Sequence, residues 1–173
     1  MPLVLNAEVG SATANSYCTV AEANAYHDFH VAETVWESAA GASNNVQVRA
    51  LVMATRLLDE QYDWIGTKAT AEQALRWPRV GAMDRDGYPI AYDELPRDLI
   101  RATAELARYL LAGNRFDAID DAQSGIEEVR AGSVMVKFTQ ATQPMVIPAS
   151  VAAMLAALAS GMAGDLSVPL VRV

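Results

Sequence analysis

Residues 55–81 read TRLLDEQYDWIGTKATAEQALRWPRVG, and this segment predicts a helix, a break and a second short helix. Apolar side chains leading into it recur at i, i+3, i+4, i+7 and i+10, which predicts one face of a helix lasting to about Tyr62. These side chains are Val48, Leu51, Val52, Thr55 and Leu58. Gly66 breaks the pattern. Residues 70–75 favour a short helix that ends at Trp77, because a residue before proline is pushed out of the helical region.

Toward the N-terminus the pattern predicts two further short helices. Residues 3–5 are typical of a short strand or an arm. Thr19, with Glu22 three residues later, has the spacing of a capping box and predicts a helix that lasts to about His30. A second short helix is expected over residues 32–39, followed by a linker over residues 41–45.

Toward the C-terminus the first strong signal is a turn at Asp86-Gly87. Asp93 or Glu94 is expected to cap the long helix that follows, with Pro96 tolerated in its first turn. This helix is expected to stop at about residues 113–114, where Gly-Asn is a common C-terminal signal.

The periodicity then changes from helix to strand. Val134, Val136 and Phe138 alternate with polar or longer side chains, which predicts a strand, with residues 126–130 as its weaker hairpin partner. A last helix is expected from Pro148 to Gly161, with one face formed by Val151, Met154, Leu155 and Leu158. The predicted fold is therefore mainly α: a bundle of about five helices over residues 1–160 with one hairpin, and an extended C-terminal arm over residues 161–173.

Composition bounds the possible functions. The chain has 173 residues, which suits one domain, and its 52% hydrophobic content excludes a disordered chain. Its formal net charge of −8 argues against tight wrapping of DNA, which needs a basic face. No apolar run is long enough for a membrane span, and no signal peptide is recognised. The single cysteine, Cys18, excludes an internal disulfide framework.

Few residues suggest chemistry. His27, His30 and Glu33 follow helical spacing and could bind a metal, but two ordinary histidines are the favoured interpretation. Cys18 with His27 could form a nucleophile and base, but a small buried cysteine is favoured. Asp84-x-Asp86-Gly87 resembles the start of a calcium loop but lacks the remaining ligands. No catalytic or phosphate-binding motif occurs, so we expect no enzyme, no cofactor and no metal site.

A role in binding single-stranded DNA has one candidate segment. Such binding needs aromatic platforms interleaved with basic side chains. Residues 62–79 contain a modest version, made of Tyr62, Trp64, Lys68, Arg76, Trp77 and Arg79. The alternative, which the acidic balance favours, is that the tryptophans anchor the fold and the arginines bind nearby carbonyls or acids.

Several short motifs in order resemble those of tailed-phage head–tail connector proteins, also called adaptor or head completion proteins. The similar strings are Asn15-Ser16-Tyr17 before Thr19-x-x-Glu22-Ala23, Ala54-Thr55-Arg56-Leu57-Leu58-Asp59, Tyr62-Asp63-Trp64-x-Gly66, and Gln73-Ala74-Leu75-x-Trp77-Pro78-Arg79. Asp84-x-Asp86-Gly87 and Leu95-Pro96 follow in the same order. Some relatives carry a label of DnaT-like single-stranded-DNA binding, which we keep as the alternative function.

The resemblance implies a structural virion protein that forms a ring, taken as a dodecamer, beneath the portal. The implied partners are the portal protein, other copies of the chain and the next neck, stopper or tail protein. Double-stranded DNA would pass through the ring without sequence-specific binding and without any membrane contact. The implied location is the neck between capsid and tail, and the host cytoplasm during assembly.

Three groups of residues follow as predicted sites. The portal or subunit interface is assigned to Val151, Met154, Leu155, Leu166, Val168, Leu170 and Val171. A hairpin that pairs between subunits is assigned to Val134, Val136 and Phe138. Structural roles are assigned to the motif residues Trp64, Gly66, Trp77 and Pro78.

Overall fold

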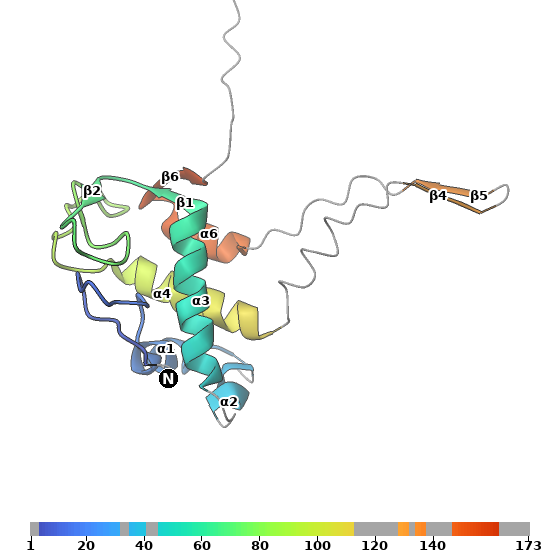
Figure 1. Cartoon of the computed structure of the whole chain (residues 1–173), viewed down its shortest axis with the longest axis horizontal. Coiled ribbons are helices and arrows are strands. Elements are labelled where there is room, and N and C mark those ends of the chain that lie inside the picture. Colours follow the sequence, from blue (N-terminus) through green and yellow to red (C-terminus); the bar gives the residue numbers. More distant parts are fainter. Residues whose placement is uncertain are drawn as a thin grey trace, which may run out of the picture.

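The computed structural model describes residues 4–31, 35–40, 45–112, 128–131, 134–137 and 147–162. The fold is mainly α with a few short strands, as the sequence predicts (Figure 1). Among the described residues, no helix is long and apolar enough to cross a membrane.

Helix α1 (Val20–His27) begins where the capping box predicts. The Thr19 hydroxyl accepts a hydrogen bond from the Glu22 N–H at 3.1 Å, and the Glu22 carboxylate accepts one from the Thr19 N–H at 2.8 Å. The second helix, α2 (Val35–Ala40), buries Trp36. Residues 32–34 and 41–44, where the rest of the predicted helix and linker fall, lie outside the described residues.

Two long helices form the centre of the molecule. Helix α3 (Val46–Gln61) runs across helix α4 (Arg97–Leu111), and the two pack against each other (Figure 1). Their facing sides are apolar, so burial of these side chains supplies the main driving force for folding. The fully buried residues at this contact include Leu51, Ala54, Leu58, Leu99, Ala102 and Leu106.

Helix α4 begins differently from the prediction. Its N-cap is Pro96, and no side chain caps it, so the assignment of Asp93 or Glu94 as the cap is wrong. The Pro96 carbonyl accepts hydrogen bonds from the N–H groups of Leu99 at 3.0 Å and Ile100 at 3.2 Å. Proline fixes its own backbone angle in the range a helix start needs, so the helix begins directly after it.

The C-terminal helix is shorter than predicted. Helix α6 (Ala149–Leu155) begins after Pro148 as expected and packs on α4, but it ends before Gly161. Strand β6 (Ala159–Met162) follows and pairs antiparallel with β1 (Tyr62–Trp64), as Figure 1 shows. This pairing extends with a hydrogen bond from the Ile65 N–H to the Leu158 carbonyl at 3.0 Å. Partners on a distant strand therefore replace further helical hydrogen bonds.

The segment between β2 (Thr67–Lys68) and β3 (Arg79–Val80) contains no helix, so the predicted helix over residues 70–75 is wrong. The Gln73 side chain explains the difference. Its amide donates hydrogen bonds to the Leu75 carbonyl at 2.9 Å and the Pro78 carbonyl at 3.0 Å, which fixes a loop. The Asp86-Gly87 turn is confirmed, with Gly87 at φ +85°.

The predicted hairpin is also present. Strands β4 (Glu128–Ala131) and β5 (Val134–Lys137) pair antiparallel, with Glu128 opposite Lys137 and Ala131 opposite Val134. Residues 161–162 of the predicted arm belong to β6, and residues 163–173 lie outside the described part of the chain.

Candidate functional site

Three of the motif strings meet at one hydrogen-bond network, which we call the motif junction: Tyr17, Asp59, Arg76 and Trp77. The Tyr17 hydroxyl donates a hydrogen bond to the Asp59 carboxylate. The same hydroxyl accepts hydrogen bonds from the main-chain N–H groups of Arg76 at 3.1 Å and Trp77 at 3.2 Å. The Arg76 N–H also reaches the second Asp59 oxygen at 3.2 Å. The junction thus joins the segment before α1, the end of α3 and the loop before β3.

Burial determines the protonation of this junction. Tyr17 is 1% exposed, and loss of solvation, followed by the nearby Asp59 charge, raises the pKa of its hydroxyl well above the ordinary value. Loss of solvation also raises the pKa of Asp59, although the hydrogen bonds from Tyr17 and Arg76 act in the opposite direction. The tyrosine therefore remains a hydrogen-bond donor at neutral pH.

Arg79 is the second polar centre of this region. Its guanidinium donates hydrogen bonds to the carbonyls of Ile65 at 2.7 Å, Arg76 at 3.1 Å and Trp64 at 3.2 Å, and also to that of Gly66. Arg79 is 9% exposed, and loss of solvation lowers its pKa. Its donors are thus directed at the protein's own main chain.

The aromatic side chains of the candidate DNA-binding segment are internal. Trp64 is 6% exposed, Trp77 1% and Tyr62 5%. The two tryptophan rings pack edge-to-face with centroids 5.9 Å apart. A base cannot stack on a ring face that the core already covers. Of the six residues of that segment, only Lys68 and Arg76 are exposed, and the Lys68 ammonium donates to the Gln73 carbonyl at 2.8 Å.

An open groove of about 730 Å³ lies on another part of the surface. It is lined by side chains from α1 and the turn after it, from α4 and from α6, including Ala25, Tyr26, Phe29, Ile100, Arg101 and Met154. Phe29 is 90% exposed, and Val31 two residues later is 99% exposed.

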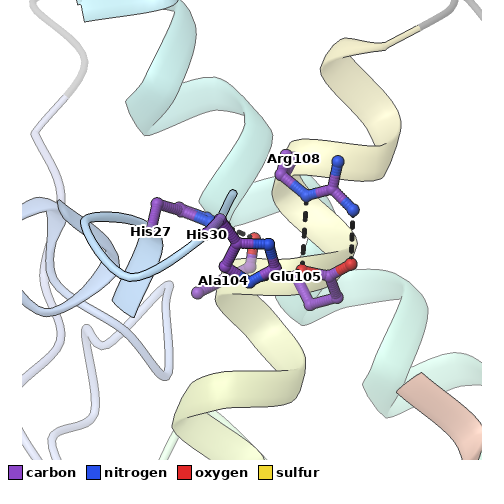
Figure 2. Close-up of polar contacts among 5 residues, drawn as sticks. All are labelled: His27, His30, Ala104, Glu105 and Arg108. Atoms are coloured by element: carbon purple, nitrogen blue, oxygen red, sulfur yellow. Dashed lines mark hydrogen bonds and ion pairs between the residues drawn. The ribbon is translucent and has the colours of Figure 1, made fainter. Parts of the chain in front are cut away.

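A third group of residues brings two histidines and a carboxylate together. One ligand atom from each of His27, His30 and Glu105 lies within 4.8 Å of the others (Figure 2). Glu33, the predicted third ligand, lies outside the described residues. Sequence reasoning missed Glu105. The available signal was a charged residue on the apolar face of α4, between Ala102 and Leu106 in the helix.

Cys18 and Asp84 follow their structural interpretations. Cys18 is fully buried, and loss of solvation, followed by the Glu22 charge, raises its pKa to about 12. A thiol with that pKa is a poor nucleophile at neutral pH. The Asp84 carboxylate accepts hydrogen bonds from the N–H groups of Asp86 at 3.0 Å and Tyr88 at 2.8 Å, which closes the turn.

The predicted interface residues have different locations. Val151 and Leu155 are fully buried in the core of their own chain, whereas Met154 lines the groove. Val134 lies at the start of β5 and Val136 within it. The remaining predicted residues lie outside the described part of the chain: Phe138, Leu166, Val168, Leu170 and Val171. Of the residues assigned structural roles, Trp64, Trp77 and Pro78 are buried, and Gly66 has φ +80°.

Comparison with known proteins adds a family. A family model described as "Putative DnaT-like ssDNA binding protein" matches residues 1–173, the whole chain. The chain belongs to this DnaT-like family. No curated protein and no solved structure matches it. The family's description agrees with the alternative function drawn from the sequence, and the head–tail connector identity stays a prediction.

Proposed function

We propose that this DnaT-like chain is a non-enzymatic structural protein, a head–tail connector that assembles with copies of itself beneath a phage portal. One observation carries the proposal: the aromatic side chains of the candidate DNA-binding segment, together with Arg79, are buried and hold the fold. Trp64 and Trp77 are buried, and the Arg79 guanidinium binds four main-chain carbonyls. The groups that remain available for a function are therefore those exposed on the surface.

The charge and the surface support a role in protein contact. A net charge of −8 repels phosphates, so DNA could pass through a ring of such chains without adhering to it. Exposed Phe29 and Val31 supply apolar area of the kind that protein interfaces bury. A closed ring needs two different complementary faces on each copy, one of which this area could provide.

The test is assembly with purified portal particles. The full-length chain is mixed with portal and examined by sedimentation and negative-stain imaging. A ring added to one face of the portal is the expected result. Phe29→Glu should weaken this assembly, because it places a charge in the apolar area, whereas Tyr88→Glu, at a side chain 70% exposed on the Asp86-Gly87 turn, is the matched control. Absence of any portal complex with the wild-type chain would overturn the proposal.

Binding of single-stranded DNA is the second candidate, and the family description favours it. A fluorescently labelled oligothymidylate is titrated with the chain at low and physiological salt, and anisotropy is recorded. Micromolar binding that weakens with salt and is lost in Arg76→Ala, the exposed arginine of the segment, would favour this function. Absence of binding at both salt concentrations would exclude single-stranded-DNA binding as the function.

A further inference from the structure

We propose that His27, His30 and Glu105 form a binding site for a divalent transition metal of the zinc class. Two imidazoles and one carboxylate are a donor set that Zn²⁺ accepts in proteins. The three side chains come from the end of α1, the turn after it and the middle of α4, and they converge in Figure 2. This proposal is independent of the connector function.

The distances are close to those that coordination needs. Ligands about 2.0–2.2 Å from a tetrahedral ion lie about 3.3–3.6 Å from one another. The His30 Nε2 and Glu105 Oε2 atoms are 3.7 Å apart, and the whole set lies within 4.8 Å. His30 lies on the turn after α1, where its side chain is 33% exposed. Coordination would require the three ligand atoms to move closer together than they lie in this structure.

Neighbouring groups hold two of the ligands in position. Metal-binding histidines and carboxylates are normally oriented by hydrogen bonds to groups behind them. The His27 Nε2–H donates to the Ala104 carbonyl at 3.2 Å, and the ring packs against Trp36 with centroids 5.0 Å apart. Arg108 binds Glu105 with its Nη2 atom 2.5 Å from Oε1, and with Nε 3.3 Å from Oε2. Both Glu105 oxygens thus contact Arg108, and the closer contact is at Oε1. Oε2, which also lies 3.7 Å from His30 Nε2, is the oxygen placed to bind a metal.

The burial of Glu105 separates this cluster from an ordinary surface ion pair. The Glu105 side chain is 9% exposed and has one guanidinium and two imidazoles as polar neighbours. A buried carboxylate is costly unless it is paired, and a bound cation would pair it more completely. His30 and its neighbour Phe29 also line the open groove, so a fourth coordination position would face the groove and accept water or a further ligand.

A bound ion would fasten the end of α1 to the middle of α4. An ion that binds only the folded chain raises its stability by an amount that grows with the logarithm of the ion concentration. The expected signature is therefore a melting temperature that rises with added metal.

The test uses the full chain, freed of any histidine tag and treated with EDTA, then dialysed. Zn²⁺ binding is measured by isothermal titration calorimetry and by thermal unfolding at increasing ZnCl₂. Cobalt(II) absorption in the visible region reports the coordination geometry. We expect one Zn²⁺ per chain, a rising melting temperature and a Co²⁺ spectrum with nitrogen and oxygen ligands.

Variants decide whether the ion occupies this cluster. His30→Gln, at the most exposed of the three ligands, should weaken Zn²⁺ binding at least about tenfold. Asp28→Asn, on the same turn but outside the cluster, should leave binding unchanged. Glu105→Gln keeps the side-chain shape and should weaken binding similarly, with circular dichroism confirming that each variant folds. No saturable binding by the wild-type chain, or equal binding by His30→Gln, would overturn the proposal.

Discussion

The motif junction makes a strong prediction for Tyr17→Phe. This substitution removes one oxygen atom and keeps the ring that fills the core. The lost hydroxyl donates to Asp59 and accepts hydrogen bonds from the N–H groups of Arg76 and Trp77. Arg76 keeps a second acceptor on Asp59 at 3.2 Å, but the Trp77 N–H loses the acceptor that the hydroxyl provides.

The magnitude follows from the two groups left behind. A buried donor without its partner costs about 1–3 kcal/mol, and a hydrogen bond to a charged group contributes about 1.5–3 kcal/mol. Burial already disfavours the ionised form of Asp59, and the hydrogen bond from Tyr17 offsets part of this cost. The substitution removes that hydrogen bond. The two effects share one atom and are not additive. We therefore expect Tyr17→Phe to lower the free energy of unfolding by about 2–4 kcal/mol, a large share of the about 5–15 kcal/mol typical of a domain.

The assay is urea unfolding followed by tryptophan fluorescence, with a common slope fitted to all variants. Tyr88→Phe is the matched control, because Tyr88 is 70% exposed and its ring lies on the Asp86-Gly87 turn. The control should remain within about 0.5 kcal/mol of wild type. If Tyr17→Phe also falls within that range, the junction does not hold the three motif segments together and the reasoning is wrong.

Three other variants or measurements test the same structure. Gly66→Ala should lower the free energy of unfolding by more than about 2 kcal/mol, because φ is +80° and a Cβ there would lie 2.3 Å from the Val80 oxygen; urea unfolding measures it. Burial raises the pKa of Asp59 above its ordinary value of 3.8, so the folded chain holds the Asp59 proton more tightly than the unfolded chain does. The stabilisation from the protonated Asp59 carboxyl therefore falls as pH rises from 3.8 through the folded-state pKa. The stability difference between wild type and Asp59→Asn should therefore narrow as pH rises above the ordinary aspartate pKa of 3.8, as read from urea unfolding at each pH. Cys18, with a pKa of about 12, should react with a thiol reagent at pH 8 only as fast as the chain unfolds.

Patterns that extend over many residues predicted the fold well. The apolar periodicity of α3 continues over four turns, so no local interaction can outweigh it. The Thr19–Glu22 capping box is a local chemical arrangement that needs no distant partner. The alternation at Val134 and Val136 is likewise local, and both features were correctly predicted.

Predictions for short segments were wrong where a side chain or a distant strand supplies the backbone with other hydrogen-bond partners. Residues 71–75, AEQAL, are good helix formers, yet the Gln73 amide binds the Leu75 and Pro78 carbonyls instead. The end of α6 was misplaced because β1 provides backbone partners for residues 159–162. Helix propensity alone predicts poorly where such specific hydrogen bonds are available to the chain.

The site residues were harder to find because chain separation hides them. Tyr17 and Asp59 are 42 positions apart, and His27 and Ala104 are 77 apart. Tyr17 and Asp59 each stood in a motif string, but nothing in the sequence paired them. Glu105 gave a weaker signal, a charge on an otherwise apolar helix face.

The location of the motif residues changes what the family description can support. Three of the motif strings converge on the motif junction, and one of them also contains Arg79. The polar groups of the junction and of Arg79 are bonded to groups of the protein itself. Such residues specify a loop arrangement, and chains can share that arrangement while binding different ligands. In this chain the motif strings therefore account for an internal network more directly than for a contact with DNA. Function must be tested on the exposed groove, on Phe29 and Val31, and on the histidine cluster. Among the described residues of these surfaces, Glu22 in the groove lining belongs to a motif string and the others do not.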